Sequence, residues 1–468
     1  MSARTKQKKQ LKVAETSASY LVETQENRHS GGSREPLNSS AGWRTARLGE
    51  ILPIKYGKAR TEQFGYPRPQ TATFGSNGAF GTFDRALTEK PAIIVGRKGA
   101  AGAVHYSSEP CWPIDTAFYT EGSEGIFLPF FRYLLDTLQL VRLDRSTAIP
   151  SLSRDDYDAK EVRYPEAPDE QRLIVAEIEK QFTRLDAGIA ALRRVQANLK
   201  RYRAAILKAA CEGSLVPTEA ELARKEGRAH EPADKLLARV LTERRQNWQG
   251  RSLYKEPAPP HTTQLPPLPQ GWTWASVEQL STRVQYGSSA KTNENSSGIP
   301  VLRMGNIQDG KFDFDKLKYL PKAHDEFPEL LLARGDLLFN RTNSAELVGK
   351  TAVYKGTPHL CSFASYLIRA QFGDGCVPDF VSYFINSVFG RAWIAGVVSQ
   401  QVGQANVNGT KLQALAIPLP PLAEQTRIVA EVERQLSVVE EQEAVVSANL
   451  QRATRLQQSI LSAAFGTA

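Results

Sequence analysis

Two long stretches of the chain, residues 166–212 and 421–468, carry apolar residues at alternating steps of three and four positions. On a helix this spacing gives a narrow apolar stripe, which is typical of a helix that pairs with another helix along its length. Prolines stand just before each stripe, where a helix tolerates them. We predict a coiled-coil seam formed by Ile178, Phe182, Leu185, Ile189, Leu192 and Leu199 from the first stretch and by Val432, Leu436, Val439, Val446 and Leu450 from the second.

The two stretches are copies of one another. The sequence EQRLIVAEIEKQF, from Glu170, returns as EQTRIVAEVERQL from Glu424, and RAAILKAA returns as QQSILSAA. For a single copy, an ordinary long core helix or a homodimer coil would explain the pattern about as well as pairing within the chain. Two copies with matching ends favour pairing within one chain. So long a period predicts two similar halves and not a solenoid of short units. Polar residues interrupt the seams and could fix their register at a cost in stability. They are Gln196, Arg203, Glu443 and Gln457.

The hydrophobic and polar patterns divide the chain into six segments. Globular sequence between the long helices mixes short β-type runs with Gly-rich turns, which is typical of α+β or α/β domains. The polar start, with its Gly/Ser patch, is typical of a disordered extension. The segments are 1–41 (disordered extension), 42–165 (first globular domain), 166–212 (central long helix), 213–270 (connector with a short helix and a Pro-rich linker), 271–420 (second globular domain) and 421–468 (distal long helix).

Local patterns inside these segments predict shorter elements and a partial echo between the halves. We expect strands over 92–95 and 118–120, an apolar helix over 130–140 and an amphipathic helix over 234–248. A Gly-Trp pair and a Tyr-Gly pair open each half, at 42–43 and 56–57 and again at 271–272 and 286–287. Between these anchors, IIVGRK at 93–98 has no evident twin in RMGNIQDGKFDF. We therefore expect a repeated scaffold that carries two different domains.

Composition narrows the class of protein. The net charge is +9 and the sequence pI about 9.2, which favours a polyanionic partner. The four cysteines lie far apart without a C-x-x-C pair, which argues for a reducing compartment and against a structural zinc site. No run of eighteen apolar residues exists, and the lysine-rich start has no apolar segment behind it. We expect a cytoplasmic protein that does not contact membranes.

The motifs of common enzymes are absent from the sequence. The Gly-Lys-Thr at 349–351 resembles the end of a P-loop, but Ser344 stands where the first glycine is required. There is no H-E-x-x-H zinc motif, no G-x-S-x-G nucleophile turn and no Gly-rich loop for a nucleotide or S-adenosylmethionine. We therefore expect no catalytic site, metal or cofactor in this chain.

Polar residues in turns are the remaining candidates for chemistry. Arginine can pair with guanine, and asparagine or glutamine with adenine, while lysine, serine and threonine more often hold phosphates. For any single one of these residues an ordinary surface turn is the favoured explanation, while we expect each domain to contain some such surface. The candidate DNA-binding residues are Lys58, Arg60, Asn77, Arg97 and Lys98 in the first domain and Arg303, Asn306, Arg341, Thr342, Asn343, Ser344, Lys350, Gln404 and Asn406 in the second.

Several stretches together resemble one family. They are IPLPPLAEQTRIVAEVE and LPQGWTWASVEQL, together with ARGDLLFNRTNSAELVGKTAVY and IIVGRKGAAGAVHY. The sequence resembles the specificity subunit of type I restriction–modification systems. The resemblance implies an α+β protein with two α/β target-recognition domains, joined by two long helices that pair as an antiparallel coiled coil in a pseudo-two-fold repeat. Each domain would read one half of a bipartite, asymmetric site in double-stranded DNA.

The resemblance also implies partners. Two modification (methyltransferase) subunits would dock on the long helices, and restriction (translocase and nuclease) subunits would join them. Adenine methylation with S-adenosylmethionine, and translocation and cleavage with ATP and Mg, would belong to those subunits. Two alternatives remain from the residues alone: a coiled-coil scaffold that does not read DNA, and a free-standing DNA methyltransferase with an atypical site.

Overall fold

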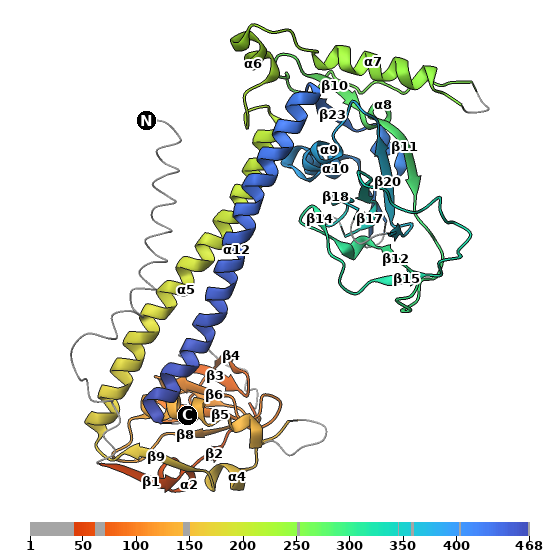
Figure 1. The fold of residues 1–468 in the computed structure, drawn as a ribbon. Coiled ribbons are helices and arrows are strands. Elements are labelled where there is room, and N and C mark those ends of the chain that lie inside the picture. The colour runs from red at the N-terminus through yellow and green to blue at the C-terminus, as the bar shows by residue number, and fades with distance from the viewer. Residues whose placement is uncertain are drawn as a thin grey trace. The chain divides into compact units, whose positions relative to one another are not determined.

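The computed structural model describes residues 42–60, 71–143, 150–249, 253–344, 346–356, 360–401 and 404–466. The disordered extension expected over 1–41 lies outside the described residues. The chain divides into two compact units. Unit 1 contains the described residues up to Ala190 and from Leu450 onward, and unit 2 contains residues 191–449 (Figure 1).

Unit 1 is built on three small sheets. Its strands are β1 (Trp43–Arg47), β2 (Lys55–Tyr56), β3 (Thr71–Gly75), β4 (Gly78–Phe83), β5 (Ala92–Gly96), β6 (Val104–Ser107), β7 (Trp112–Pro113), β8 (Ala117–Thr120) and β9 (Glu161–Pro165). The sheet orders are β1-β9, β2-β8-β5-β6 and β4-β3-β7. Short helices connect them: α2 (Leu48–Ile51), α3 (Leu128–Thr137), the 3-10 helix η2 (Leu140–Leu143) and α4 (Arg154–Asp158).

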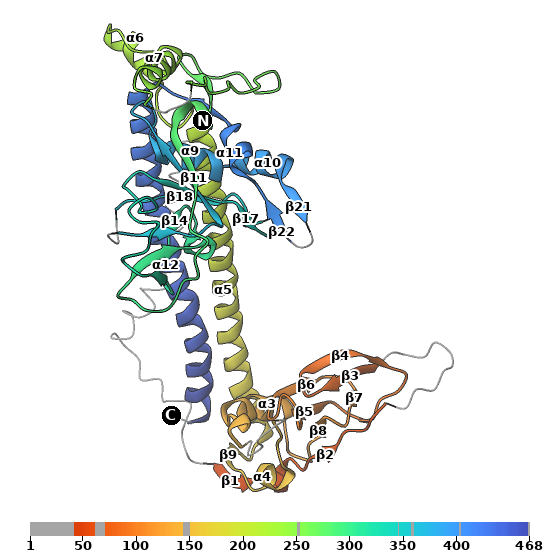
Figure 2. The same ribbon diagram turned by 90° about the vertical axis from the view of Figure 1, so that its right-hand side faces the viewer.

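Unit 2 repeats this plan and adds to it. Its corresponding strands are β10 (Thr273–Ser276), β11 (Ser281–Tyr286), β12 (Ile299–Leu302), β15 (Lys318–Leu320), β16 (Leu337–Asn340), β18 (Thr351–Val353), β19 (Ser362–Phe363), β20 (Leu367–Phe372) and β23 (Ala416–Leu419). The sheet orders are β10-β23, β11-β20-β16-β18 and β15-β12-β19. The added strands are β13 (Ile307–Gln308) with β14 (Lys311–Phe312), and β17 (Thr342–Asn343), β21 (Ser399–Gln401) and β22 (Gln404–Asn406). Figure 2 shows the β21–β22 hairpin beside β17.

The helices of the two units correspond less closely than the strands do. They are α6 (Glu219–Glu226), α7 (Ala233–Gln246), α8 (Val277–Leu280), the 3-10 helix η3 (Met304–Asn306), α9 (Pro378–Asn386), α10 (Val388–Val397) and α11 (Gly409–Gln413). Helix α7 is the amphipathic helix expected over 234–248. In unit 1, the helix expected over 130–140 is α3, which begins at Leu128 and ends at Thr137. Gln139, just beyond it, takes a φ of +48° that no α-helix can continue.

The shared strand order gives the segment at 93–97 a counterpart that its sequence does not reveal. In each unit the central strand, β5 or β16, lies between equivalent neighbours, and one pair in the smaller sheet (β3 with β7, β12 with β19) is parallel. The segment IIVGR at 93–97 therefore has a counterpart, LLFNR at 337–341, and not RMGNIQDGKFDF. Every residue of β5 and β16 is buried, because both faces of the sheet are covered.

Two long helices, α5 (Pro168–Cys211) and α12 (Leu422–Phe465), each contribute to both units. In unit 1 the first turns of α5 and the last turns of α12 join one core, in which Ile178 is 2% exposed and the Phe465 ring packs edge-on against Phe130 at 5.2 Å. In unit 2 the last turns of α5 and the first turns of α12 share another core, which contains Ile206 and Val432.

The predicted seam residues fall into two groups by burial. Those fully buried are Ile178, Val432, Val439 and Val446, and those half-buried are Phe182, Leu185, Ile189, Leu192, Leu199, Leu436 and Leu450. Phe182 packs on the core of unit 1, and Leu199 and Leu436 pack on that of unit 2. Two polar interruptions also meet within unit 2: Arg203 Nη2 donates to the Glu443 carboxylate at 3.0 Å.

In the first turn of each long helix, a glutamate accepts a hydrogen bond from the indole N–H of a tryptophan in its own unit. Trp43 Nε1 donates to Glu170 at 3.2 Å in unit 1, and Trp272 Nε1 donates to Glu424 at 2.9 Å in unit 2. Glu424 is fully buried and also accepts the backbone N–H of Glu219 at 2.8 Å. Burial raises the pKa of the Glu424 carboxyl.

The following glutamine, Gln171 or Gln425, is fully buried and connects three segments. Its carbonyl oxygen accepts the N–H of the residue before α3 or α9 at 2.8 Å, an otherwise unpaired donor at a helix start. Its amide donates to the carbonyl of Pro165 or Pro420, at 2.9 Å in both units. The repeated Glu-Gln pair therefore fixes each long helix to its domain.

Candidate nucleic-acid interface

In unit 1 an arginine lies over an exposed tyrosine where two strands of the main sheet end. The guanidinium of Arg97, which follows β5, lies 5.3 Å from the ring centroid of Tyr56, the last residue of β2. Tyr56 is 51% exposed and packs edge-on against the buried ring of Phe118 at 5.0 Å. The Arg97–Tyr56 pair therefore lies at the surface and packs on a buried aromatic ring.

Unit 2 contains the same arrangement. The guanidinium of Arg341, which follows β16, lies 4.9 Å from the ring centroid of Tyr286, the last residue of β11. Tyr286 is 43% exposed, and its hydroxyl accepts the N–H of Gly409 at 2.7 Å. A second hydrogen bond, from Arg341 Nη1 to the Ser365 carbonyl, is long at 3.4 Å.

The backbone places the two Arg–Tyr pairs equivalently. The N–H of Arg97 donates to Thr116 O at 2.9 Å and that of Arg341 to Tyr366 O at 3.0 Å. Their carbonyls accept from the N–H groups of Leu152 and Val407, both at 2.9 Å. The sequence carried a signal for this match, because each arginine follows a buried apolar strand in IIVGR or LLFNR, yet those strings share only the arginine itself.

The glycine after each tyrosine lets neighbouring backbone pass close by. A Cβ at Gly57 would collide with the carbonyl of Ile114, and one at Gly287 would collide with that of Phe363. Their N–H groups donate to Ala117 O at 3.0 Å and to Leu367 O at 3.4 Å. The repeated Tyr-Gly pair is thus a packing requirement that also sets the tyrosine at the strand end.

Three of the other candidates in unit 1 lie near its Arg–Tyr pair. Lys58 and Lys98 are exposed, and their N–H groups donate to Pro113 O and Thr116 O. Asn77 is exposed in the β3–β4 turn, next to Ser76, whose hydroxyl lies near Gly99. Arg60 is held elsewhere: its guanidinium lies over Phe80 at 5.3 Å and donates to Thr82 O.

In unit 2, Thr342 and Asn406 adjoin the Arg–Tyr pair and bind each other, with Asn406 Nδ2 donating to the Thr342 hydroxyl at 3.1 Å. Asn343 is half-buried and Ser344 is exposed in the same loop. Gln404 pairs with Gln401 through the backbone in the β21–β22 hairpin. Thr342, Asn343 and Asn406 therefore lie together where β17 pairs with β22.

The remaining candidates of unit 2 are engaged with nearby loops. Lys350 Nζ donates to the Gln308 side chain at 3.3 Å, and Arg303 Nη2 donates to Lys316 O at 2.8 Å. Asn306 is 5% exposed, its Oδ1 accepts the Arg303 N–H, and its Nδ2 donates to two carbonyls of its own loop. We therefore correct its assignment: the Asn306 amide holds this loop and is not available to a base edge.

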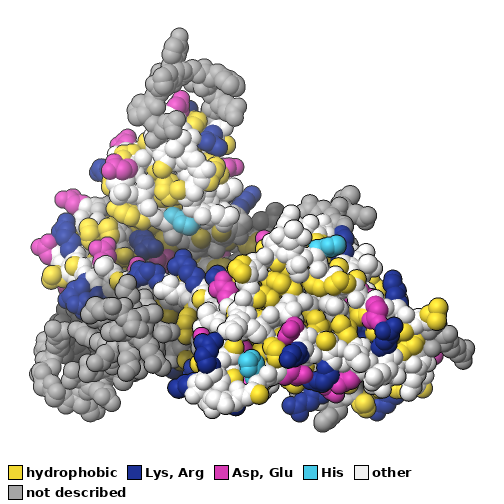
Figure 3. Space-filling view, turned by 90° about the horizontal axis from the view of Figure 1, so that it is seen from above, with side chains coloured by type: hydrophobic (Ala, Val, Ile, Leu, Met, Phe, Trp, Pro, Cys, Tyr) yellow, Lys and Arg dark blue, Asp and Glu magenta, His cyan; other side chains and the backbone are white. Residues whose placement is uncertain are grey.

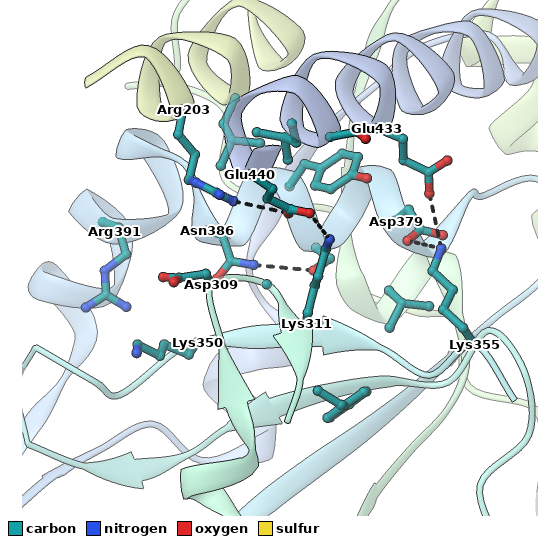
Figure 4. Close-up of a pocket in the computed structure, with 18 of the residues that line it drawn as sticks. Arg203, Asp309, Lys311, Lys350, Lys355, Asp379, Asn386, Arg391, Glu433 and Glu440 are labelled. Carbon is teal, nitrogen blue, oxygen red and sulfur yellow. Dashed lines mark hydrogen bonds and ion pairs between the residues drawn. The ribbon is translucent and has the colours of Figure 1, made fainter. Parts of the chain in front are cut away.

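Charge by itself does not mark an interface. Figure 3 shows lysine and arginine side chains interspersed with aspartate and glutamate over the face in view. Within unit 2, a cavity of about 600 Å³ is lined by residues of both signs. Lys311 binds Glu440 at 2.7 Å, and Lys355 binds Asp379 at 2.6 Å (Figure 4). These ion pairs neutralise Lys311 and Lys355, and the Arg–Tyr pairs at the surface are the better candidates for a polyanion.

Two further observations concern the described residues only. No helix among them has the length and apolar content needed to cross a bilayer. They also hold no cluster of three or more His, Cys, Asp or Glu side chains placed to share a metal ion.

The fold therefore defines a protein with two copies of one mixed α and β domain, each followed by a long helix and each presenting an Arg–Tyr pair. The model of the type I restriction modification DNA specificity domain matches residues 40–197 and 281–440, more than half of the chain. The chain belongs to this family.

Individual relatives agree with this assignment. The EcoKI specificity subunit of Escherichia coli K12 is 27% identical over 299 residues, which cover 63% of this chain and 55% of that protein. The EcoDI specificity subunit of Escherichia coli is 22% identical over 446 residues, 90% of this chain and 88% of that protein. The alignments with the EcoKI and StySPI subunits span about half the length of those relatives.

A solved structure shares the fold. A chain in a structure on complex assembly and conformational transition of the type I R-M system superposes with a TM-score of 0.59 at 18% identity. The superposition covers 91% of this chain and 98% of that chain.

Proposed function

We propose that this chain is the DNA-recognition subunit of a type I restriction–modification complex. Unit 1 reads one half of a bipartite, asymmetric DNA site and unit 2 reads the other. The observation that carries the proposal is the repeated surface, an arginine over an exposed tyrosine at equivalent strand ends, set among polar residues that differ between the units. Arginine and tyrosine suit DNA, since one pairs with phosphates or bases and the other offers an exposed ring.

The long helices act as the spacer in this proposal. Helices α5 and α12 pair antiparallel as a coiled coil, and two half-sites are read together only when their readers are held at a fixed spacing and rotation along the duplex. Contacts within each unit support the pairing. In unit 2, Arg203 bonds Glu443, while Leu207, one turn further along α5, lines the same cavity as Glu433. In unit 1, the first turns of α5 meet the last turns of α12.

The chain has no catalytic role in this proposal and holds no cofactor. It docks two modification subunits, which methylate adenine with S-adenosylmethionine, and restriction subunits that translocate and cleave DNA with ATP and Mg. The complex works on DNA in the cytoplasm. Support comes from the relatives, which are named specificity subunits, and from the structural neighbour, which concerns assembly of a type I system.

The decisive experiment sequences methylated adenines genome-wide in cells with and without this chain. We expect one bipartite motif whose methylation disappears with the chain, and the motif gives both half-sites and the spacer. A chain that leaves every methylated motif unchanged, and binds duplex DNA no more weakly as salt rises, fits the scaffold alternative instead. Methyl transfer by the purified chain alone would favour the methyltransferase alternative.

The spacer role has its own test. Inserting four residues at matching points of both long helices adds about one helical turn to each. We expect the spacer of the methylated motif to change while both half-sites stay the same. An unchanged spacer in a folded, active variant would contradict the role of the helices as a ruler.

A further inference from the structure

The two units share one surface feature in full and differ in the positions around it. Both Arg–Tyr pairs occupy the same place in the backbone hydrogen-bond pattern. Next to them, Lys98 pairs with Ser151, whereas Thr342 at the equivalent place pairs with Asn406. The loop that follows returns to the sheet at Gly102 in unit 1 and only at Gly349 in unit 2, where equivalent N–H groups donate to Gly96 and Asn340.

This contrast separates two kinds of DNA contact. Two half-sites of an asymmetric sequence present different base edges but the same sugar-phosphate backbone. The set of side chains that reads bases has to differ between the units, while a side chain that holds the backbone can be the same. The positions that differ are Lys98 and Thr342, Ser151 and Asn406, and Ala103 and Lys350.

From this we infer that Arg97 and Arg341 are equivalent phosphate anchors, one for each half-site, and that the differing positions beside them read the bases. The inference rests on the proposed function and assigns roles within it. Asn77 of unit 1 belongs to the same differing group, because its turn lies beside the loop that contains Lys98.

The chemistry of the pairs suits this role. Guanidinium groups bind phosphate through charge-assisted hydrogen bonds, often with two donors at once. The tyrosine ring beneath restricts the guanidinium before DNA arrives, which lowers the entropy lost on binding.

The experiment measures DNA binding by the full-length chain and by its R97A, R341A, R97K and R341K variants. The probes are a duplex carrying the motif found by methylation sequencing and a duplex of equal composition with both half-sites scrambled. For each alanine variant we expect affinity for both duplexes to fall by roughly tenfold. The slope of log affinity against log salt should become shallower by about 0.9, the value of one phosphate contact. The lysine variants should restore the salt slope, which counts the phosphates neutralised, but only part of the affinity, because lysine has neither the paired donors nor the planar group that lies on the tyrosine ring.

The control is R132A, which removes another arginine that lies over a tyrosine in unit 1, Tyr133, but that belongs to helix α3. It should leave both affinities and the salt slope unchanged. Circular dichroism and thermal unfolding identify any variant that fails to fold, in which case the lysine variant decides.

Two results would overturn the assignment. If R97A or R341A lowers affinity for the motif only, or changes one base of the methylated motif, that arginine reads a base. If both folded variants bind both duplexes like the wild type, the pairs do not contact DNA. The proposed function fails separately, when the wild-type chain neither binds DNA in a salt-dependent way nor determines a methylated motif.

Discussion

Units 1 and 2 order their strands identically, yet the centres of their main sheets are chemically unlike. Opposite Ile94 of β5 stands Tyr119, and opposite Leu338 of β16 stands Arg369. Arg369 is 2% exposed and binds the equally buried Asp336, while the position before β5's Ile93 holds only Ala92. The comparison teaches that the backbone pattern and a few side-chain contacts define the domain, while even its core can change from apolar to ionic.

The largest expected effect comes from breaking the buried ion pair of unit 2. The guanidinium of Arg369 also donates to the carbonyls of Leu331 and Glu329, and burial lowers its pKa. R369A leaves the buried Asp336 without its cationic partner, although Asp336 still accepts hydrogen bonds from Ala333 N and Gln371 Nε2. We expect unit 2 to lose about 3–5 kcal/mol of stability. Hydrogen exchange resolved by unit is the measurement.

The matched change in unit 1 is Y119F, which keeps the ring and should alter stability by less than about 0.5 kcal/mol. A double variant, D336N with R369M, removes both charges and should recover most of the loss. Equal destabilisation by R369A and by the double variant would mean that packing and not charge dominates at this position.

The next effect should be the same in both units. Q171A and Q425A each remove a buried amide that makes three hydrogen bonds, which leaves donors and acceptors unpaired. We expect each variant to lose about 2–3 kcal/mol in its own unit, measured by hydrogen exchange. Q181A is the control, because Gln181 is half-buried and its side chain bonds Glu177 on the same helix. A loss in one unit and none in the other would show that the repeated glutamine is not equally required.

A smaller effect depends on pH and concerns unit 2. Burial raises the pKa of Glu424 in the folded state. The stability that this difference in pKa contributes is therefore complete below the ordinary glutamate pKa and is lost as pH rises through the raised value. E424Q cannot titrate. The stability of the wild type relative to E424Q should therefore decline as pH rises from about 4.5. Chemical denaturation followed by tryptophan fluorescence across that range measures this difference, and a difference that does not vary with pH would contradict it.

The smallest effect is expected at the contact between the polar interruptions. The side chains of Arg203 and Glu443 are 18% and 32% exposed, so solvent screens their ion pair. A double-mutant cycle with R203A and E443A should give a coupling energy of about 0.5–1 kcal/mol. Zero coupling would indicate that the pair contributes nothing to the stability of unit 2, whatever it does for register.

Much of the scaffold could be predicted from the sequence, because its signals are local or literally repeated. The long helices follow from their apolar stripe, and the Glu-Gln pair stands out because both copies keep it. The apolar pattern does not predict helix α6, although Thr218 and Glu221 form a capping box at its start.

The candidate site was harder to predict, since its geometry depends on contacts across the fold. Arg97 and Arg341 were each noticed as polar turn residues, but their equivalence rests on backbone hydrogen bonds to Thr116 and Tyr366, which no sequence pattern encodes. The burial of Asn306 likewise depends on carbonyls of Asp313 and Asp315 later in the chain. Residue type indicated the chemistry, and only the fold separated exposed side chains from those already engaged.

The first and last strands of each domain are paired, Trp43 opposite Pro165 in unit 1 and Thr273 opposite Leu419 in unit 2. The chain thus enters and leaves a domain at one place, beside the tryptophan and the Glu-Gln pair. A recombination event that replaces everything between those strands would leave the junction chemically unchanged. Under the proposed function, such an exchange would replace the DNA preference of one unit as a cassette, without redesigning the helices or the other unit.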